Sequence, residues 1–221
     1  GLRAGRDGVG NRVAHCLIHD APHQAIAYSG NNHTIEFNEI HHVVLESGDA
    51  GVLYSGRDWT FRGNIVRYNF FHHIPRGPGS GTKGVYLDDC CSSTAIFGNV
   101  FYRMREAVFI GGGRDNAVEN NIFIDCDYPL HLDDRGLTWD YFQPDGHIYK
   151  SLKQSDFQNP PWSAPYPELA RILEHQPQAP LGNVVDKNLS CSSNWDESVQ
   201  RWRSMFKKHG IDESQILISK N

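Results

Sequence analysis

The segment Ile35-Glu36-Phe37-Asn38-Glu39-Ile40 defines a frame with an aliphatic residue three positions before an asparagine and an apolar residue two positions after it. The frame recurs in full at three more places and with one substitution at two, around the following anchors: Cys16, Asn69, Asn99, Asn121 and Asn188. The gaps between successive anchors are 22, 31, 30, 22 and 67 residues. A motif that returns at such a period is typical of a stacked repeat and not of one compact globule.

The residues around each anchor alternate between apolar and polar, are rich in β-branched and aromatic types, and lack a helical period. We therefore predict an all-β fold, a parallel β-helix of about six coils, one for each anchor. Successive coils would lie about 4.8 Å apart. At that spacing Asn38, Asn69, Asn99 and Asn121 would stack into a column of side-chain amides that bond to one another.

A second set of aligned segments runs beside the anchors: Ala25–Gly30, Gly51–Gly56, Gly84–Asp89, Ala107–Gly112 and Pro129–Asp134. Two apolar positions in each segment are expected to point inward, and this alignment places Val52 and Tyr54 among them. The residues between and after them would point outward. The predicted outward residues are Leu53, Tyr86, Phe109 and His131, followed by Ser55, Asp88, Gly111 and Asp133.

Insertions interrupt both edges of this second set of segments. They occupy residues 44–49, 75–81 and 57–59, with a long excursion from about residue 135 to residue 182. Insertions in a solenoid form loops, so we expect them to enclose a groove. We predict a β-helix domain over residues 1–193 and a C-terminal helical segment over residues 194–221. The first would include a short helix at Pro167–Glu174, and the second a helix from an Asn194 cap to Gly210 that covers the open end of the coils.

Composition excludes several classes of protein. A net charge of −5 and no basic run argue against a nucleic-acid partner. No run of about 18 apolar residues is present, so no membrane span is predicted. Five cysteines without metal-type spacing predict no disulfide framework, with Cys126 and Cys191 packed as small buried residues. Because the chain opens at Gly1 and not at Met, we expect a fragment of a longer protein.

Carboxylates gather along the second set of segments. The candidate catalytic residues are Asp49, Asp88, Asp89 and Asp133. Asp88 and Asp133 would lie two coils apart, about 9.6 Å before side-chain rotation, and Asp49 would lie one coil from Asp88. Paired carboxylates at such separations serve as acid and base in glycosidases. The alternatives are a calcium site, since acidic clusters suit calcium, or aspartates that only terminate strands.

Cationic, acidic and aromatic side chains surround these aspartates. Aromatic faces stack on sugar rings, and arginines hold hydroxyl groups or carboxylates. The predicted substrate-binding residues are Arg57, Asp58, Trp59, Tyr86, Phe109, Arg114, His131, Arg135 and Trp139.

Histidines form a further column. His19, His41 and His72 each fall three positions after an anchor, and His42 and His73 follow two of them. Stacked imidazoles on an exposed strand face explain this pattern. The alternative is a transition-metal site, but no open-site motif accompanies the column, so we predict no metal ligands.

Several segments resemble the right-handed parallel β-helix proteins around glycoside hydrolase family 141. These segments are Asp49–Trp59, Arg62–His72, Gly84–Asp89, Phe109–Asn116, His131–Gly136, Tyr166–Leu169 and Pro180–Asn183. The resemblance implies a right-handed coil and a carbohydrate-active enzyme with an aspartate pair, best matched by Asp49 and Asp88 or Asp89. It also implies a longer parent protein, which we expect to be secreted or periplasmic, so the fragment could lack activity.

Three functions follow from the sequence. The first is a glycoside hydrolase that cleaves a polysaccharide with paired aspartates and no cofactor. The second is a polysaccharide lyase with Lys83, Arg57 or Arg135 as base, where the acidic groove would repel a uronate unless calcium intervened. The third is a non-catalytic solenoid that binds a glycan.

Overall fold

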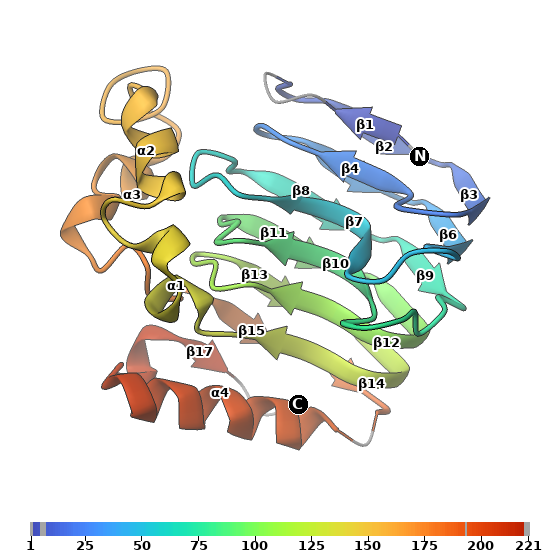
Figure 1. Ribbon diagram of the computed structural model, residues 1–221. Helices are drawn as coiled ribbons and strands as arrows, with labels where there is room; N and C mark the ends of the chain where they lie inside the picture. The colour runs from blue at the N-terminus through green and yellow to red at the C-terminus, as the bar shows by residue number, and fades with distance from the viewer. Residues whose placement is uncertain (1, 5–7, 193, 219–221) are drawn as a thin grey trace.

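The computed structural model describes residues 2–4, 8–192 and 194–218, and Figure 1 shows its strands winding in successive coils. The strands are β1 (Leu2–Ala4), β2 (Arg12–Ala14), β3 (Leu17–Ala21), β4 (Ile26–Tyr28), β5 (Thr34–Glu36), β6 (Glu39–Val43), β7 (Ala50–Gly56), β8 (Asn64–Arg67), β9 (Phe70–His72), β10 (Thr82–Asp88), β11 (Thr94–Phe97), β12 (Val100–Ile110), β13 (Ala117–Glu119), β14 (Ile122–Leu132), β15 (Val184–Asp186), β16 (Leu189–Ser190) and β17 (Leu217–Ile218). The helices are α1 (Arg135–Thr138), α2 (His147–Gln154), α3 (Pro167–Ala170) and α4 (Trp195–His209), with 3₁₀ turns η1 (Asp140–Phe142), η2 (Ile172–Glu174) and η3 (Glu213–Gln215).

Every strand pair is parallel, and neighbouring strands come from successive coils. One sheet has the order β1-β4-β7-β10-β12-β9-β6-β3, with β14 beside β12 and β16 beside β14. The other has the order β17-β15-β13-β11-β8-β5-β2. The long strands β12 and β14 pass around a corner, so they join two faces of the coil within one sheet. This topology confirms the predicted all-β parallel β-helix.

The predicted asparagine ladder is also confirmed, and Asn188 extends it. The Nδ2 atom of Asn38 donates to Oδ1 of Asn69 at 2.9 Å, and the same bond links Asn69 to Asn99, Asn99 to Asn121 and Asn121 to Asn188 at 3.0 Å. Each Oδ1 also accepts from the backbone N–H of the preceding asparagine. The buried amides are thereby satisfied without water.

The corners of the coil are made by single residues in the left-handed region. The residue before each anchor has a positive φ at His15, Phe37, Tyr68, Gly98, Asn120 and Lys187. A second series at the next corner consists of Asp20, His42, His73, Arg103 and Asp125. Such a conformation costs a non-glycine residue about 1 kcal/mol, and stacked hydrogen bonds at the corners offset this cost.

Another column of side chains, which the sequence analysis missed, closes a further corner. Asn64 Oδ1 accepts from the backbone N–H of His33, Asn116 Oδ1 from that of Thr94, and Asn183 Oδ1 from that of Asn116. Because histidine and threonine stand at two of its positions, the three asparagines of this column do not form an uninterrupted series in the sequence.

The inside of the coil is filled by stacked apolar side chains. Phe71, Phe101 and Phe123 lie with ring centroids 5.0 and 5.2 Å apart, and Trp195 of α4 continues the row at 5.8 Å from Phe123. Trp202 of α4 is also buried in this core. Helix α4 therefore covers the last coil, as Figure 1 shows. The two predicted domains begin at residue 1, meet at residue 193 and end at residue 221. These three positions lie outside the described residues.

The long excursion forms a separate helical lobe beside the coils (Figure 1). Its apolar residues, such as Phe142 and Leu152, pack with Trp59 and Cys90 of the β-helix into a second buried cluster. The helix predicted at Pro167–Glu174 is divided into α3 and η2. All five cysteines are free, and Cys191 is exposed, so its predicted burial was wrong.

Asn99→Ala tests the ladder. The substitution removes the partners of the Asn69 and Asn121 amides and of the Val66 carbonyl, all of them buried. We expect the free energy of unfolding to fall by about 3 kcal/mol, measured by urea denaturation. Asn159→Ala is the matched control, because exposed Asn159 bonds only within its own turn, and a change below about 0.5 kcal/mol is expected there. Equal losses in both variants would contradict the role of the ladder.

Candidate functional site

A cavity of about 490 Å³ opens on the outer wall formed by β10, β12 and β14, next to β7. Asp49 and Ser80 bring one set of insertions to its edge, and Arg57 and Trp139 bring the other. Most of the predicted site residues line it: Asp49, Arg57, Tyr86, Asp88, Asp89, Phe109, His131, Asp133, Arg135 and Trp139. The stacking of coils thus brings together residues that are far apart in the sequence.

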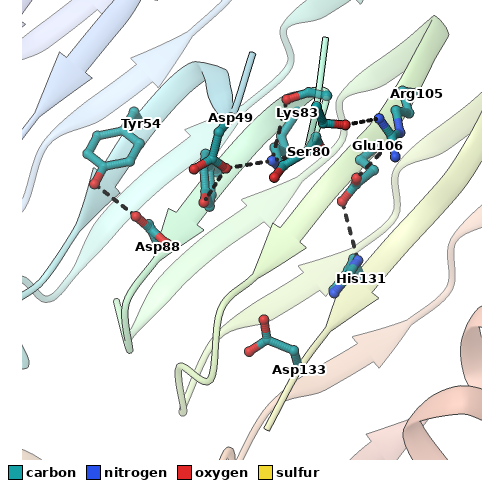
Figure 2. A network of polar contacts seen from close by, with 12 residues as sticks. Asp49, Tyr54, Ser80, Lys83, Asp88, Arg105, Glu106, His131 and Asp133 are labelled. Carbon is teal, nitrogen blue, oxygen red and sulfur yellow. Dashed lines mark hydrogen bonds and ion pairs between the residues drawn. The ribbon is translucent and has the colours of Figure 1, made fainter. Parts of the chain in front are cut away.

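The register of β7 corrects one of the predicted columns. Leu53 pairs with Val85 and Tyr54 with Tyr86, so Leu53 and Ser55 are inward and fully buried, whereas Tyr54 faces the cavity side. The sequence analysis aligned Gly51 with Gly84. In the structure Gly51 pairs with Lys83, so the register of β7 against β10 differs from the predicted one by one residue. In this register the Tyr54 hydroxyl donates to Asp88 Oδ2 at 3.0 Å (Figure 2).

Arg135, the first residue of α1, holds three aspartates together. Its Nη1 donates to Asp88 Oδ1 at 2.5 Å and to Asp89 Oδ1 at 3.0 Å, while Nη2 lies 2.8 Å from Asp133 Oδ2. The guanidinium occupies the space above Gly111, where a Cβ would lie only 2.9 Å from Arg135 Cζ. Gly111 therefore leaves room for one cation between Asp88 and Asp133, two coils apart.

The electrostatics of this cluster are strongly coupled. Burial and the charge of Asp88 raise the pKa of Asp89, although Arg135 opposes the shift. Burial alone would lower the pKa of Arg135, but the hydrogen bonds and charges of Asp133 and Asp88 raise it above its usual value. The guanidinium thus stays charged, and the three carboxylates surround it in place of solvent.

Lys83 organises a second cluster at the other end of the cavity. Its buried ammonium donates to Asp49 Oδ1 at 3.0 Å and to the carbonyls of Ser80 and Gly81 at 3.2 and 3.4 Å. Tyr86 also donates to Asp49 Oδ1, at 3.1 Å. Burial opposes ionisation of Asp49, but the bond and charge of Lys83 prevail and lower its pKa.

Tyr86 connects the two clusters. Its pKa is raised first by burial and then by the negative charges of Asp88 and Asp49. The phenolic hydroxyl donates to Asp49, and Asp88 lies near enough for its charge to act on the same group. Asp49, Tyr86 and Asp88 all line the cavity wall.

Glu106 is a cavity residue that the sequence analysis missed. Its side chain is only 7% exposed, its Oε2 lies 3.3 Å from Nδ1 of His131, and its Oε1 lies 3.8 Å from Nε of Arg105 (Figure 2). Within the described part of the chain, no group donates a hydrogen bond to Oε2. Glu106 is the register partner of Lys83 on the next coil. A carboxylate directly before the apolar run Ala107–Ile110 was the signal that could have identified it.

A row of rings crosses the coils, but most of its faces are already covered. Tyr54, Tyr86, Phe109 and His131 follow one another with centroids 5.4, 4.8 and 4.3 Å apart. Lys83 Nζ lies 4.7 Å from the centre of Tyr86, and Arg135 Cζ lies 5.1 Å from that of Phe109. Trp139 is 50% exposed, so among these aromatics it offers a ligand the largest open surface.

Three predicted substrate-binding residues lie outside the cavity. Trp59 is fully buried in the apolar cluster of the lobe. Asp58 accepts from the backbone and hydroxyl of Thr60 and from Ser151 of α2. Arg114 donates to the carbonyl of His175 at 2.8 Å. These side chains attach the helical lobe to the coils, which corrects their assignment to the substrate.

The calcium alternative gains no support from this geometry. Calcium is bound by several oxygen ligands that converge on one point. Here Asp88, Asp89 and Asp133 converge on the guanidinium of Arg135. A calcium ion would have to displace that side chain.

Comparison with known proteins identifies the architecture. A family model described as "Right handed beta helix region" matches residues 5–137, more than half of the chain. No curated protein and no solved structure shows a significant match. The family match does not single out glycoside hydrolase family 141. Across the described part of the chain, every helix is too short or too polar to cross a bilayer.

Arg135→Gln tests the shared cation. Without the guanidinium, the two buried carboxylates of Asp88 and Asp89 and the partly buried one of Asp133 repel one another, and we expect a loss of about 3 kcal/mol in unfolding free energy near neutral pH. The pKa of Asp89, already raised by burial, would rise further. The folded variant would then bind more protons than the unfolded chain, so its stability would recover as pH falls.

Denaturation of wild type and variant at neutral pH and at about pH 5 measures both effects. Arg171→Gln is the control, because exposed Arg171 pairs only with exposed Glu168 on the surface of the lobe. If the difference in unfolding free energy between wild type and Arg135→Gln stays constant or grows as the pH falls, the shared-cation arrangement is contradicted.

Proposed function

Because the chain belongs to the right-handed β-helix family, we propose that it is a glycoside hydrolase that cleaves a polysaccharide in the cavity beside β10 and β12. The fold alone does not select this function, since hydrolases, lyases and binding proteins share it. The observation that carries the proposal is the gathering of Asp49, Asp88 and Asp89 around Tyr86 in one cavity open to solvent, with Tyr86 donating to Asp49.

Glycoside hydrolysis needs one ionised and one protonated carboxyl group. Asp49 suits the ionised role, because Lys83 lowers its pKa while its side chain stays 65% exposed. Asp89 suits the acid role, because burial and Asp88 raise its pKa. Asp88 lies between them and is held by Tyr54 and Arg135. Opposite pKa shifts within one cavity support a division of labour among these aspartates.

The remaining cavity residues suit a sugar. Trp139 is half exposed although Arg135 lies 4.8 Å over its ring, and Arg57 has a side chain 64% exposed that can donate to hydroxyl groups. The cavity is open to solvent and is lined by residues of several successive coils, which favours a chain-like substrate. A polysaccharide or oligosaccharide is the ligand class that we propose.

A polysaccharide lyase is the second candidate, and one observation favours it. Nδ1 of His131 lies 3.3 Å from Oε2 of the buried Glu106 carboxylate, so a small rotation of the ring would let that carboxylate accept its proton and orient the imidazole as a base. Lys83 is poorly suited to that role, because its ammonium already has three acceptors. In this version Arg57 and Arg105 would face the uronate.

Asp49→Asn and Asp89→Asn test the hydrolase. Each replaces a carboxyl group by an amide of the same size, and we expect product release from the hydrolysed glycan to fall about 10²- to 10⁴-fold. The measurement is reducing-end formation on a panel of neutral and acidic polysaccharides. Asp156→Asn, an exposed aspartate outside the cavity, should keep full turnover.

Thermal melting of each variant separates lost catalysis from lost folding. Unchanged turnover in both cavity variants would exclude the proposed pair. A product with a new carbon–carbon double bond, lost in His131→Gln and kept in Asp49→Asn, would establish the lyase instead. Glycan binding without any product would establish a binding protein.

A further inference from the structure

A histidine cluster lies on another face of the coil, outside the cavity. The rings of His19, His41 and His72 stack across β3, β6 and β9 with centroids 5.1 and 4.7 Å apart. His42 and His73 form a parallel stack at 5.6 Å. Stacking alone explains neither the carboxylate beside the column nor the short contacts between neighbouring imidazoles.

We infer that Glu39, His41 and His72 form a binding site for a divalent transition metal, with Zn²⁺ as the best-suited ion. One ligand atom from each residue lies within 4.8 Å of the other two. Oε1 of Glu39 lies 3.2 Å from Nε2 of His72, across two adjacent strands. Small side-chain rotations bring three such atoms to the roughly 2 Å bond lengths of zinc.

The short contacts between neighbouring histidines favour the imidazole tautomer that can bind a metal through Nε2. Nδ1 of His41 lies 2.7 Å from Nδ1 of His42, and the same distance joins Nδ1 of His72 to Nδ1 of His73. A hydrogen bond between two such nitrogens needs a proton on one of them. When His41 and His72 donate from Nδ1, their Nε2 atoms carry the lone pair that binds metal, as in zinc sites whose histidines have outer partners.

The backbone explains why these neighbouring rings meet. Successive side chains of a strand normally point to opposite faces. His42 and His73 have φ values of 47° and 50°, and this left-handed turn brings each ring beside that of the preceding histidine. The corner conformation of the coil therefore builds the pair twice, on adjacent coils.

The ligand set selects the class of metal. Two imidazoles and one carboxylate suit zinc and similar ions, whereas calcium and magnesium prefer oxygen ligands alone. The Glu39 side chain is 53% exposed, so an ion can reach the site from solvent and keep a water ligand.

Calorimetric titration of the full chain with ZnCl₂ tests the site. We expect one zinc ion per chain, and loss of that binding in both His72→Gln and Glu39→Gln. His73→Phe removes only the outer partner of His72, and it should weaken zinc binding about 10- to 100-fold. His175→Gln, at an exposed histidine of the lobe, should bind like wild type.

The same titration with CaCl₂ should show no comparable binding at this site. Cobalt substitution gives an independent readout, because its visible absorption should disappear with His72→Gln and persist with His175→Gln. Absence of stoichiometric zinc binding by the wild-type chain would overturn the inference. So would binding that survives both ligand substitutions or is unchanged in His73→Phe, since either result would indicate adventitious surface histidines.

Discussion

The structure depends on one requirement: the corner of each coil must lie directly against the corner of the next. The bonds from Asn38 through Asn69, Asn99 and Asn121 to Asn188 enforce this, because each amide meets both the side chain and the backbone of its neighbour. A shift of one residue at any corner would leave buried amides unpaired. The ladder thereby fixes the register of the outer wall, although the insertions between coils vary in length.

The cavity has an acidic wall and two buried cations, Lys83 and Arg135. One of them, Arg135, belongs to the helical lobe and so links the lobe to the cavity. Arg135 begins the excursion and penetrates between Asp88 and Asp133, so the first turn of the lobe is part of the cavity. At the other end of the excursion, Arg114 of the coil binds the carbonyl of His175. The lobe is consequently attached at both of its ends, and its position determines the position of the guanidinium.

Features that repeat from coil to coil can be predicted from the sequence. Features that depend on the position of the helical lobe, or on a one-residue shift in strand register, cannot. The asparagines share one letter and one flanking pattern, so their column could be read directly. Tyr54 was placed inward because Gly51 and Gly84 look equivalent, although Gly51 pairs with Lys83. Trp59 was predicted to stack on a sugar ring. It is buried instead by the helical lobe, whose position cannot be predicted from the residues around Trp59. Glu106 lacks a repeated counterpart in the alignment.

The candidate cavity and the proposed histidine site both include residues in the left-handed region. Asp89, with φ of 41°, follows Asp88, and the two carboxylates reach the same atom of Arg135. His73, with φ of 50°, follows His72, and the two imidazoles meet at Nδ1. In a regular strand, adjacent side chains point to opposite faces and could not meet in this way. The local strain of each corner is therefore what places two adjacent functional groups on one surface, and the stacked coils supply the stability that maintains it.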